Sequence, residues 1–358
     1  ADAGHDVHLV LGTAQGPLLP EVGAHVRIVE LHAANMLAAV RPLANYLRTA
    51  RPAALLATLR NANLAAVAAR SLARTPCTLV LREANTLSEP LQRRFSLKLA
   101  TYRRLMRRLY PAATHLVANS EGSAQDLSDV SGVPLERIAV LPNPIDVATL
   151  DARAGEPMHP PPPFGDRSTH ARIVAMGRLT EQKGFDVLLD AFAELVGRRP
   201  ATLALLGEGD EREALRARAE RHGVGHLVWM PGFVPNPYPY LRNADVFALA
   251  SRWEGSPNVV SEALALGVPV AATDCPHGPR ELLRDGALGA LAAVDDAPAL
   301  AKAIERTLDR PPDPGALRDA ARGQDASVIV RRYEALLAPA VEPHPHAERG
   351  TPAGGSPT

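Results

Sequence analysis

Residues 172–195, RIVAMGRLTEQKGFDVLLDAFAEL, join a short apolar run to an amphipathic stretch through a loop that carries two cations. The run at 172–177 has the length and composition of a buried β-strand. From Phe185 to Val196, apolar residues recur at i, i+3, i+4 and i+7, which predicts a helix with one buried face. A strand followed by such a helix is the repeating unit of a parallel sheet covered by helices.

The same alternation extends along the chain in both directions. In the second half we expect further strands at 201–207, 227–232, 246–251, 268–274 and 288–294. In the first half we expect strands at 7–11, 26–31, 54–59, 78–83, 115–120 and 138–143, with helices near 35–50, 61–74, 90–109 and 121–131. The sequence therefore predicts an α/β protein with two parallel-sheet units. Ligands of such sheets bind beyond the carboxyl ends of the strands, here in the cleft between the units.

A Pro-rich stretch without periodicity separates the two units and sets the expected domain boundaries. We expect a first domain at 1–146, a linker at 147–170 and a second domain at 171–325. A C-terminal helix should follow at 326–340, with its return to the first domain left open. The low-complexity residues 341–358 should form a disordered tail.

Composition excludes several classes of protein. The 358 residues carry zero formal net charge, which disfavours a nucleic-acid-binding protein. The two cysteines, Cys77 and Cys275, lie far apart without a Cys-x-x-Cys pattern, which disfavours a disulfide scaffold or structural zinc and favours a reducing compartment. We find no apolar run of bilayer length and no signal-peptide pattern, so we expect a cytoplasmic protein.

Two cations lie where the first strand of the second unit meets its helix. Arg178 follows the strand, and Lys183 precedes the helix. Cations beside helix amides can bind a diphosphate, and the flanking Gly177 and Gly184 allow close backbone approach. The alternative is that both are solvated surface cations.

Two glutamates lie eight residues apart in EGSPNVVSE, residues 254–262. Ser256 predicts an N-cap and Pro257 the first residue of a helix that ends near Leu266. Glu262 then shares a face with the helix's first amides, near Asn258 and Val259, whereas Glu254 precedes the helix. Carboxylates accept hydrogen bonds from vicinal hydroxyls, so the pair could hold the two sugars of one nucleotide-sugar. The alternative is a capping Glu254 and a solvated Glu262.

These motifs resemble those of the family 4 retaining glycosyltransferases. EGSPNVVSE matches that family's E-x7-E motif, and residues 177–195 and 275–304 resemble its other donor-domain blocks. The resemblance implies the GT-B fold, two Rossmann-like domains facing across a cleft. It also implies that Arg178 and Lys183 neutralise the leaving diphosphate, that Glu254 contacts the transferred sugar and that Glu262 binds the ribose. Further expected donor-binding residues are Gly177, Gly255, Ser256, Pro257, Asn258 and Val259, with the backbone at Phe233 and Val234 along the base.

The resemblance implies transfer of a hexose or N-acetylhexosamine from a nucleotide sugar with retention of configuration. Among nucleotide sugars we expect a UDP-sugar. The acceptor would be a glycan or a polyprenyl-diphosphate-linked glycan of the cell surface. No Asp-x-Asp occurs in the chain, so we expect Arg and Lys to take the place of a metal and predict no cofactor. Two alternatives stay open: another GT-B enzyme such as a nucleotide-sugar epimerase, and a non-catalytic nucleotide-sugar-binding remnant.

The first unit departs from the family pattern in two places. The chain begins at a segment resembling the family's second strand, so the first strand and its Gly-rich loop are expected to be missing. A fragment, a misassigned start or lost activity would each account for this. Where the family often has a histidine, the chain reads LREANTLS, and Glu83 or Asn85 is the acceptor-side candidate. We expect Glu281 to cap or support the helix after HGPR.

Residues 90–110 contain seven Lys or Arg and no acid, interleaved with apolar residues. A basic amphipathic helix is typical of binding to an anionic membrane surface, which predicts peripheral association with the inner face of the membrane. The alternative is a half-buried helix with a solvated basic face.

Overall fold

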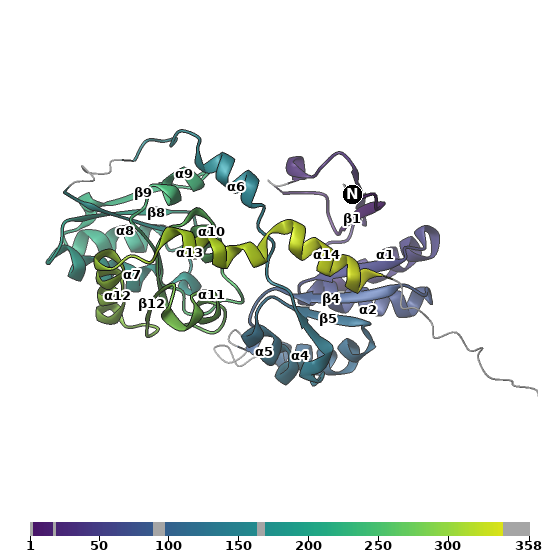
Figure 1. Cartoon of the computed structure of the whole chain (residues 1–358). Coiled ribbons are helices and arrows are strands. Elements are labelled where there is room, and N and C mark those ends of the chain that lie inside the picture. The colour runs from purple at the N-terminus through teal and green to yellow at the C-terminus, as the bar shows by residue number, and fades with distance from the viewer. Residues whose placement is uncertain (1–2, 17–18, 89–96, 163–168, 339–358) are drawn as a thin grey trace, which may run out of the picture.

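Parallel strands alternate with helices in two domains, which lie side by side in Figure 1. The computed structural model describes residues 3–16, 19–88, 97–162 and 169–338. The expected tail at 341–358 lies outside the described residues, as do parts of the expected linker and of the basic helix.

The second domain is built on a six-stranded parallel sheet. Its strand order is β12-β11-β10-β7-β8-β9. The strands are β7 (Ala171–Met176), β8 (Ala201–Leu206), β9 (Val228–Gly232), β10 (Val246–Leu249), β11 (Val270–Thr273) and β12 (Gly289–Ala292). The order reverses between β7 and β10, so the carboxyl ends of these two strands flank the switch point, where ligands of such sheets bind.

Helices cover both faces of this sheet, which explains why its strands are nearly continuous apolar runs. One face packs against α7 (Phe185–Val196), α8 (Arg212–Arg221) and α12 (Ala297–Asp309) around Phe192, which is fully buried. The other packs against α9 (Tyr238–Arg242), α10 (Asn258–Leu266) and α13 (Pro314–Ala321) around Tyr240 and Phe247. The short α11 (Pro279–Leu282) follows β11.

The first domain contains two parallel sheets, so the prediction of a single sheet is wrong here. The larger has the order β3-β4-β5-β6, and β1 pairs with β2. Val10 of β1 and Leu55 of β3 both pack against a small core around Leu47, so side chains link the two sheets. The elements are β1 (Val7–Leu11), β2 (Val26–Glu30), α1 (Met36–Ala50), β3 (Ala54–Thr58), α2 (Arg60–Ala73), β4 (Thr78–Glu83), α4 (Leu97–Leu109), β5 (His115–Ala118), α5 (Glu121–Ser131) and β6 (Ile138–Val140).

The apolar face of α4 belongs to the core of the first domain. Met106 is 1% exposed, and Tyr102, Leu105 and Leu109 are half-buried against the same core. Four arginines on this helix are exposed: Arg103, Arg104, Arg107 and Arg108. The described part of the predicted basic helix is therefore half-buried with a solvated basic face, as the alternative interpretation has it.

The connection between the domains begins with a helix, so the prediction of an irregular linker is wrong at its start. Asp146 caps α6 (Val147–Ala154) by accepting a hydrogen bond of 2.9 Å from the Thr149 amide. Leu150 and Ala154 are buried in the core of the second domain. Burial of these two side chains and the cap together account for the helix.

The last described helix, α14 (Ala326–Leu337), returns to the first domain. It follows a bridge that pairs Ile145 with Asp325. Tyr333, Leu336 and Leu337 then pack against Val80 of β4 and neighbouring buried residues. Among the described residues, no helix combines the length and the apolar character needed to cross a membrane.

Candidate functional site

An ion pair between Lys183 and Glu254 joins the loops that follow β7 and β10. The Nζ–Oε1 distance is 2.5 Å, and the side chains are only 16% and 8% exposed. Ser251 Oγ donates to the same Oε1 at 2.7 Å. Among the described residues none donates a hydrogen bond to Oε2, so this oxygen can accept one from a ligand hydroxyl.

Gly184 lets these two loops approach each other. Its φ is +60°, a conformation that glycine adopts readily, and a Cβ at this position would lie 2.1 Å from the Ala250 carbonyl oxygen. Any larger residue would push the turn that contains Lys183 away from the end of β10. The close approach thus requires a glycine beside the predicted cation.

Arg178 and Lys183 both follow the end of β7, but they differ in burial and in bonding. Arg178 is exposed, and its side chain makes no hydrogen bond or ion pair with the described residues. Gly177 precedes it with the aliphatic part of Lys183 packed alongside. Among the described residues Arg178 is thus an unpaired cation, whereas Lys183 is already paired with Glu254.

Helix α10 begins one residue later than predicted. Pro257 is its N-cap, and the first helical residue is Asn258, so Ser256 is not the cap. The reason is that Pro257 adopts an extended conformation with ψ of 107°. The amides of Asn258 and Val259 remain at the start of the helix, where its partial positive charge favours an anion.

Glu262 lies one turn into α10 and is half-buried. Burial raises the pKa of its carboxyl group to about 7, although a hydrogen bond from Tyr238 and the charge of Arg153 act in the opposite direction. The Tyr238 hydroxyl donates to Oε1 at 3.4 Å, and the Arg153 guanidinium lies 5.1 Å from the Tyr238 ring centroid. The carboxyl group thus changes its charge near neutral pH.

The segment after β9 offers a backbone and one exposed ring. Phe233 is 72% exposed, whereas the Val234 side chain is 6% exposed and belongs to the core. The Val234 side chain is therefore not available to a ligand, whereas Phe233 presents an aromatic face to solvent.

The first domain contacts the loop that carries Glu254. A Cβ on Gly255 would lie 2.7 Å from the Ala84 carbonyl oxygen and 2.9 Å from Asn85 Cα. The Thr86 hydroxyl donates to the Glu254 carbonyl. Gly255 is therefore a point of direct contact between the domains, and the exposed Asn85 lies beside it.

Two serines of the first domain also bind the backbone of the loop that carries Glu254. Ser120 Oγ and Ser123 Oγ, from the start of α5, donate to the Gly255 carbonyl at 2.7 and 3.1 Å. Asn143 donates to the Ser256 carbonyl at 3.2 Å and also to the Asn258 side chain. Sequence reasoning missed these contacts, because they join segments that are far apart in the chain.

Glu83, the other acceptor-side candidate, does not reach this contact. It is 3% exposed inside the first domain and accepts hydrogen bonds from the Tyr110 hydroxyl and, at 2.8 Å, from Asn63. Burial raises its pKa. Glu83 therefore stabilises the interior of the domain, because the side chain of the last residue of β4 points inward.

Glu281 contacts the first domain. The prediction that it caps or supports its own helix is therefore wrong as regards capping. Its carboxylate oxygens accept hydrogen bonds of 2.9 Å from the amides of Glu121 and Gly122, the first residues of α5. An anion is favourable at this helix end. Only the N-cap Ser120 could be anticipated from sequence, because Glu281 lies 160 residues away from Glu121.

A cavity of about 200 Å³ lies between the domains beside this contact. Its lining includes Asn119, Ser120, Ser256, Glu281 and Gln324. Among the described residues, no group of three or more His, Cys, Asp or Glu side chains is placed to hold a metal ion. The predicted charged groups lie at and just beyond the carboxyl ends of β7 and β10: Arg178 and Lys183, then Glu254, the amino terminus of α10 and Glu262.

Comparison with known proteins identifies the family. Residues 170–310 match the model of the glycosyl transferases group 1, and residues 1–144 match the glycosyl transferase 4-like domain. The two matches together cover most of the chain, which belongs to the glycosyltransferases that these two models describe.

Two curated relatives come from bacterial glycan assembly. The Campylobacter jejuni N-acetylgalactosamine-N,N'-diacetylbacillosaminyl-diphospho-undecaprenol 4-alpha-N-acetylgalactosaminyltransferase is 31% identical over 201 residues, 56% of this chain and 52% of the relative. The Rhizobium meliloti lipopolysaccharide core biosynthesis glycosyltransferase LpsE is 34% identical over 199 residues, 53% of each chain. The chain thus spans about half the length of these relatives.

Solved structures share the two-domain arrangement. Anabaena HepE in complex with UDP-glucose has a TM-score of 0.72 at 23% identity, covering 92% of this chain and 91% of HepE. The fold is therefore GT-B, as the motifs predicted.

Gly255→Ala should open the contact between the domains. The added Cβ would collide with the backbone at Ala84 and Asn85, at an expected cost of about 1–3 kcal/mol to the closed arrangement. Small-angle X-ray scattering should show a larger radius of gyration than in the wild type. Gly323→Ala is the control, because a Cβ there meets nothing within 4 Å. Equal radii for both variants would show that Gly255 does not set the contact.

Proposed function

We propose that this protein transfers a hexose or N-acetylhexosamine from a UDP-sugar to a glycan or lipid-linked acceptor, with retention of configuration. The observation that carries the proposal is the alignment of charges along one edge of the second sheet. Arg178 and Lys183 follow β7, Glu254 follows β10, and Glu262 lies on the helix between the Glu254 loop and β11. The family and the relatives named above support transfer to such acceptors.

Each group has a distinct part in this proposal. Arg178, Lys183 and the first amides of α10 stabilise the charge that develops on the leaving diphosphate. Oε2 of Glu254 accepts a hydrogen bond from a hydroxyl of the transferred sugar, while Lys183 and Ser251 fix Oε1. The ionised Glu262 accepts the ribose hydroxyls, and the ring of Phe233 lies beside the base.

The ion pair also explains how donor binding changes the site. Before the donor binds, Lys183 is neutralised by Glu254 and held in place. The donor brings a diphosphate to the ammonium and a hydroxyl to the carboxylate, so both partners gain a second contact at their existing positions. Little reorganisation is then needed when charge builds up on the leaving group.

We further propose that catalysis needs no metal ion, because two cations and a helix amino terminus supply positive charge where the diphosphate would lie. Turnover of UDP-glucose, followed as release of UDP, should stay within about twofold of its original rate in excess EDTA. Arg178→Ala should lower it by about 100-fold in the same buffer. Loss of turnover in EDTA that magnesium restores would contradict the proposal.

Binding of UDP-glucose should strengthen as pH rises through the pKa of Glu262, about 7. Only the ionised carboxylate accepts hydrogen bonds through both oxygens, so affinity at pH 6 should be about tenfold lower than at pH 8. Isothermal titration calorimetry measures this affinity. UDP-glucose is used in place of UDP because it has no terminal phosphate whose own titration would change the measured affinity.

Glu262→Gln should bind more weakly at pH 8 and lose the pH dependence. Glu213→Gln is the matched control, because Glu213 is 78% exposed on α8. A pH dependence that survives in Glu262→Gln would remove Glu262 from the proposed ribose site.

We also propose that the first domain binds an anionic membrane surface through the exposed arginines of α4. Because the apolar face of this helix is used in the core, the attraction would be electrostatic and would weaken with salt. Such contact would bring the site to a lipid-linked acceptor on the inner face of the membrane.

Replacing Arg103 and Arg104 with Gln should weaken binding to vesicles that contain phosphatidylglycerol by about 30-fold, at about 1 kcal/mol for each arginine. A vesicle sedimentation assay measures this. Replacing the exposed Arg216 and Arg221 of α8 removes equal charge from the second domain and should leave binding unchanged. An equal loss of vesicle binding in both double variants would show that only net charge matters, and would contradict a specific role of α4.

A further inference from the structure

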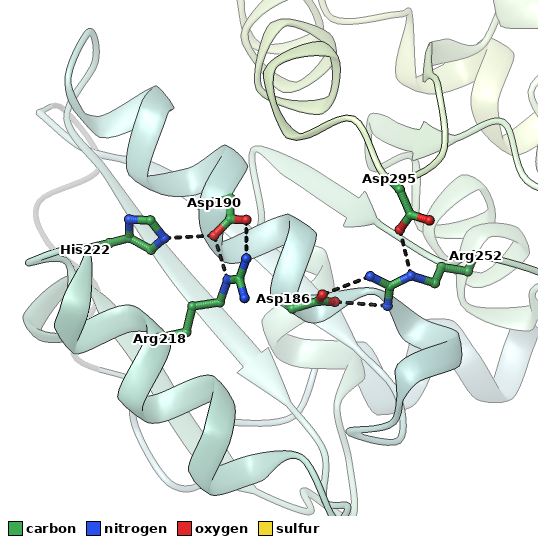
Figure 2. Close-up of polar contacts among 6 residues, drawn as sticks. All are labelled: Asp186, Asp190, Arg218, His222, Arg252 and Asp295. Carbon is green, nitrogen blue, oxygen red and sulfur yellow. Dashed lines mark hydrogen bonds and ion pairs between the residues drawn. The ribbon is translucent and has the colours of Figure 1, made fainter.

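Arg252, two residues before Glu254, binds three separate segments of the second domain, as Figure 2 shows in part. Its guanidinium donates to both carboxylate oxygens of Asp186 at 3.0 and 2.8 Å and to Asp295 at 2.6 Å. It also donates to the Glu181 carbonyl at 2.7 Å. The Arg252 side chain is 12% exposed, while the side chains of Asp186 and Asp295 are 32% and 50% exposed.

Two of the three partners of Arg252, Glu181 and Asp186, flank Lys183 in the chain. Glu181 begins the single 3₁₀ turn, Glu181–Lys183, that ends at this lysine. Asp186 lies in the first turn of α7, directly after Gly184. One guanidinium therefore holds the turn that precedes Lys183 and the helix that follows it.

Backbone contacts complete the link between the two loops. The Arg252 amide donates to the Gln182 carbonyl at 2.8 Å, and Gln182 Nε2 donates to the Trp253 carbonyl at 2.9 Å. Although burial acts in the opposite direction, the hydrogen bonds and charge of Arg252 hold the pKa of Asp186 below its usual value. Both partners are therefore charged at neutral pH.

We propose that Arg252 is a positioning residue that fixes Lys183 and Glu254 relative to each other. It touches neither, and it acts by tying the loop that carries Glu254 to the turn and helix that flank Lys183. A planar fork that donates to two carboxylates and a carbonyl has this geometry, which a single ammonium would not reproduce. The catalytic part of this inference rests on the proposed function, whereas the structural part does not.

A second arginine provides a matched control on the same helix. Arg218 donates to both oxygens of Asp190, one turn after Asp186, and His222 also bonds Asp190 at 2.8 Å (Figure 2). This pair links α7 to α8. Arg218→Gln thus removes a similar bidentate pair from α7 without changing the loop that carries Glu254.

The first measurement is the reactivity of Lys183 towards an amine-acetylating reagent, read by mass spectrometry. The chain contains three lysines, Lys98, Lys183 and Lys302, and the exposed Lys302 on α12 is the internal reference. In Arg252→Gln, Lys183 should react about fivefold faster relative to Lys302, because its bond to Glu254 is no longer held in place. Arg218→Gln should leave the ratio unchanged. An unchanged ratio in Arg252→Gln, or an equal rise in both variants, would overturn the proposal.

The second measurement is turnover of UDP-glucose. Arg252→Gln should lower kcat by about 10- to 100-fold with a smaller change in KM, and Arg218→Gln should stay within about twofold. Normal kcat in Arg252→Gln would overturn the catalytic part of the inference. If the wild type itself shows no turnover, the proposed function fails, and the acetylation ratio still decides whether Arg252 positions Lys183.

Thermal unfolding of all variants separates positioning from loss of structure. If Arg252→Gln does not fold, Asp186→Asn weakens the same link and Asp190→Asn is its control. The expected result is again a rise in Lys183 reactivity for the Asp186 variant alone, and its absence would count against the proposal.

Discussion

The buried ion pair between Lys183 and Glu254 joins the two loops from which the candidate site is built. Burial of two charges is costly, and the attraction between them offsets that cost only where geometry is good and remaining polar atoms are satisfied. Here Ser251 supplies a second hydrogen bond to the shared oxygen, Gly184 allows the close approach, and Arg252 holds the surrounding segments. Removing one partner from a buried pair typically costs about 3–5 kcal/mol, because the other charge stays behind unpaired. These contacts hold the two side chains together in the absence of a ligand.

The second domain could be predicted closely from sequence because its order is local. A strand, a loop and an amphipathic helix follow each other within about 25 residues, a spacing that the periodicity of apolar residues reveals. Because parallel strands have their carboxyl ends at one edge, the loops after β7 and β10 are neighbours, and Lys183 and Glu254 meet there in an ion pair. The position of the N-cap was missed by one residue, since Pro257 remains extended where a helical residue was expected.

Contacts between distant segments could not be predicted in this way. Glu281 and Glu121 meet because two domains face each other, and no local pattern records that meeting. Glu83 was assigned to the acceptor side from its place at a strand end, yet alternation along β4 directs its side chain inward to Tyr110 and Asn63. The helix α4 shows another limit of prediction from sequence. Its apolar stripe fits a protein core and a lipid surface equally well, and only the packing around Met106 decides between them.

The domain contact and the ion pair act on the same short segment. The first domain bonds the carbonyl groups of Glu254, Gly255 and Ser256 through Thr86, two serines of α5 and Asn143. On the other side of this segment, the Glu254 side chain binds Lys183. The orientation of the carboxylate is thus fixed from both domains at once, by bonds from the first domain to the backbone and by an ion pair within the second domain. Separation of the domains would remove these bonds but leave the ion pair intact, because Lys183 and Glu254 both belong to the second domain, where the Glu254 carbonyl also accepts a bond of 2.7 Å from the His277 amide. Under the proposed function, the donor can therefore bind to the ion pair before the first domain adds its own constraints to this segment.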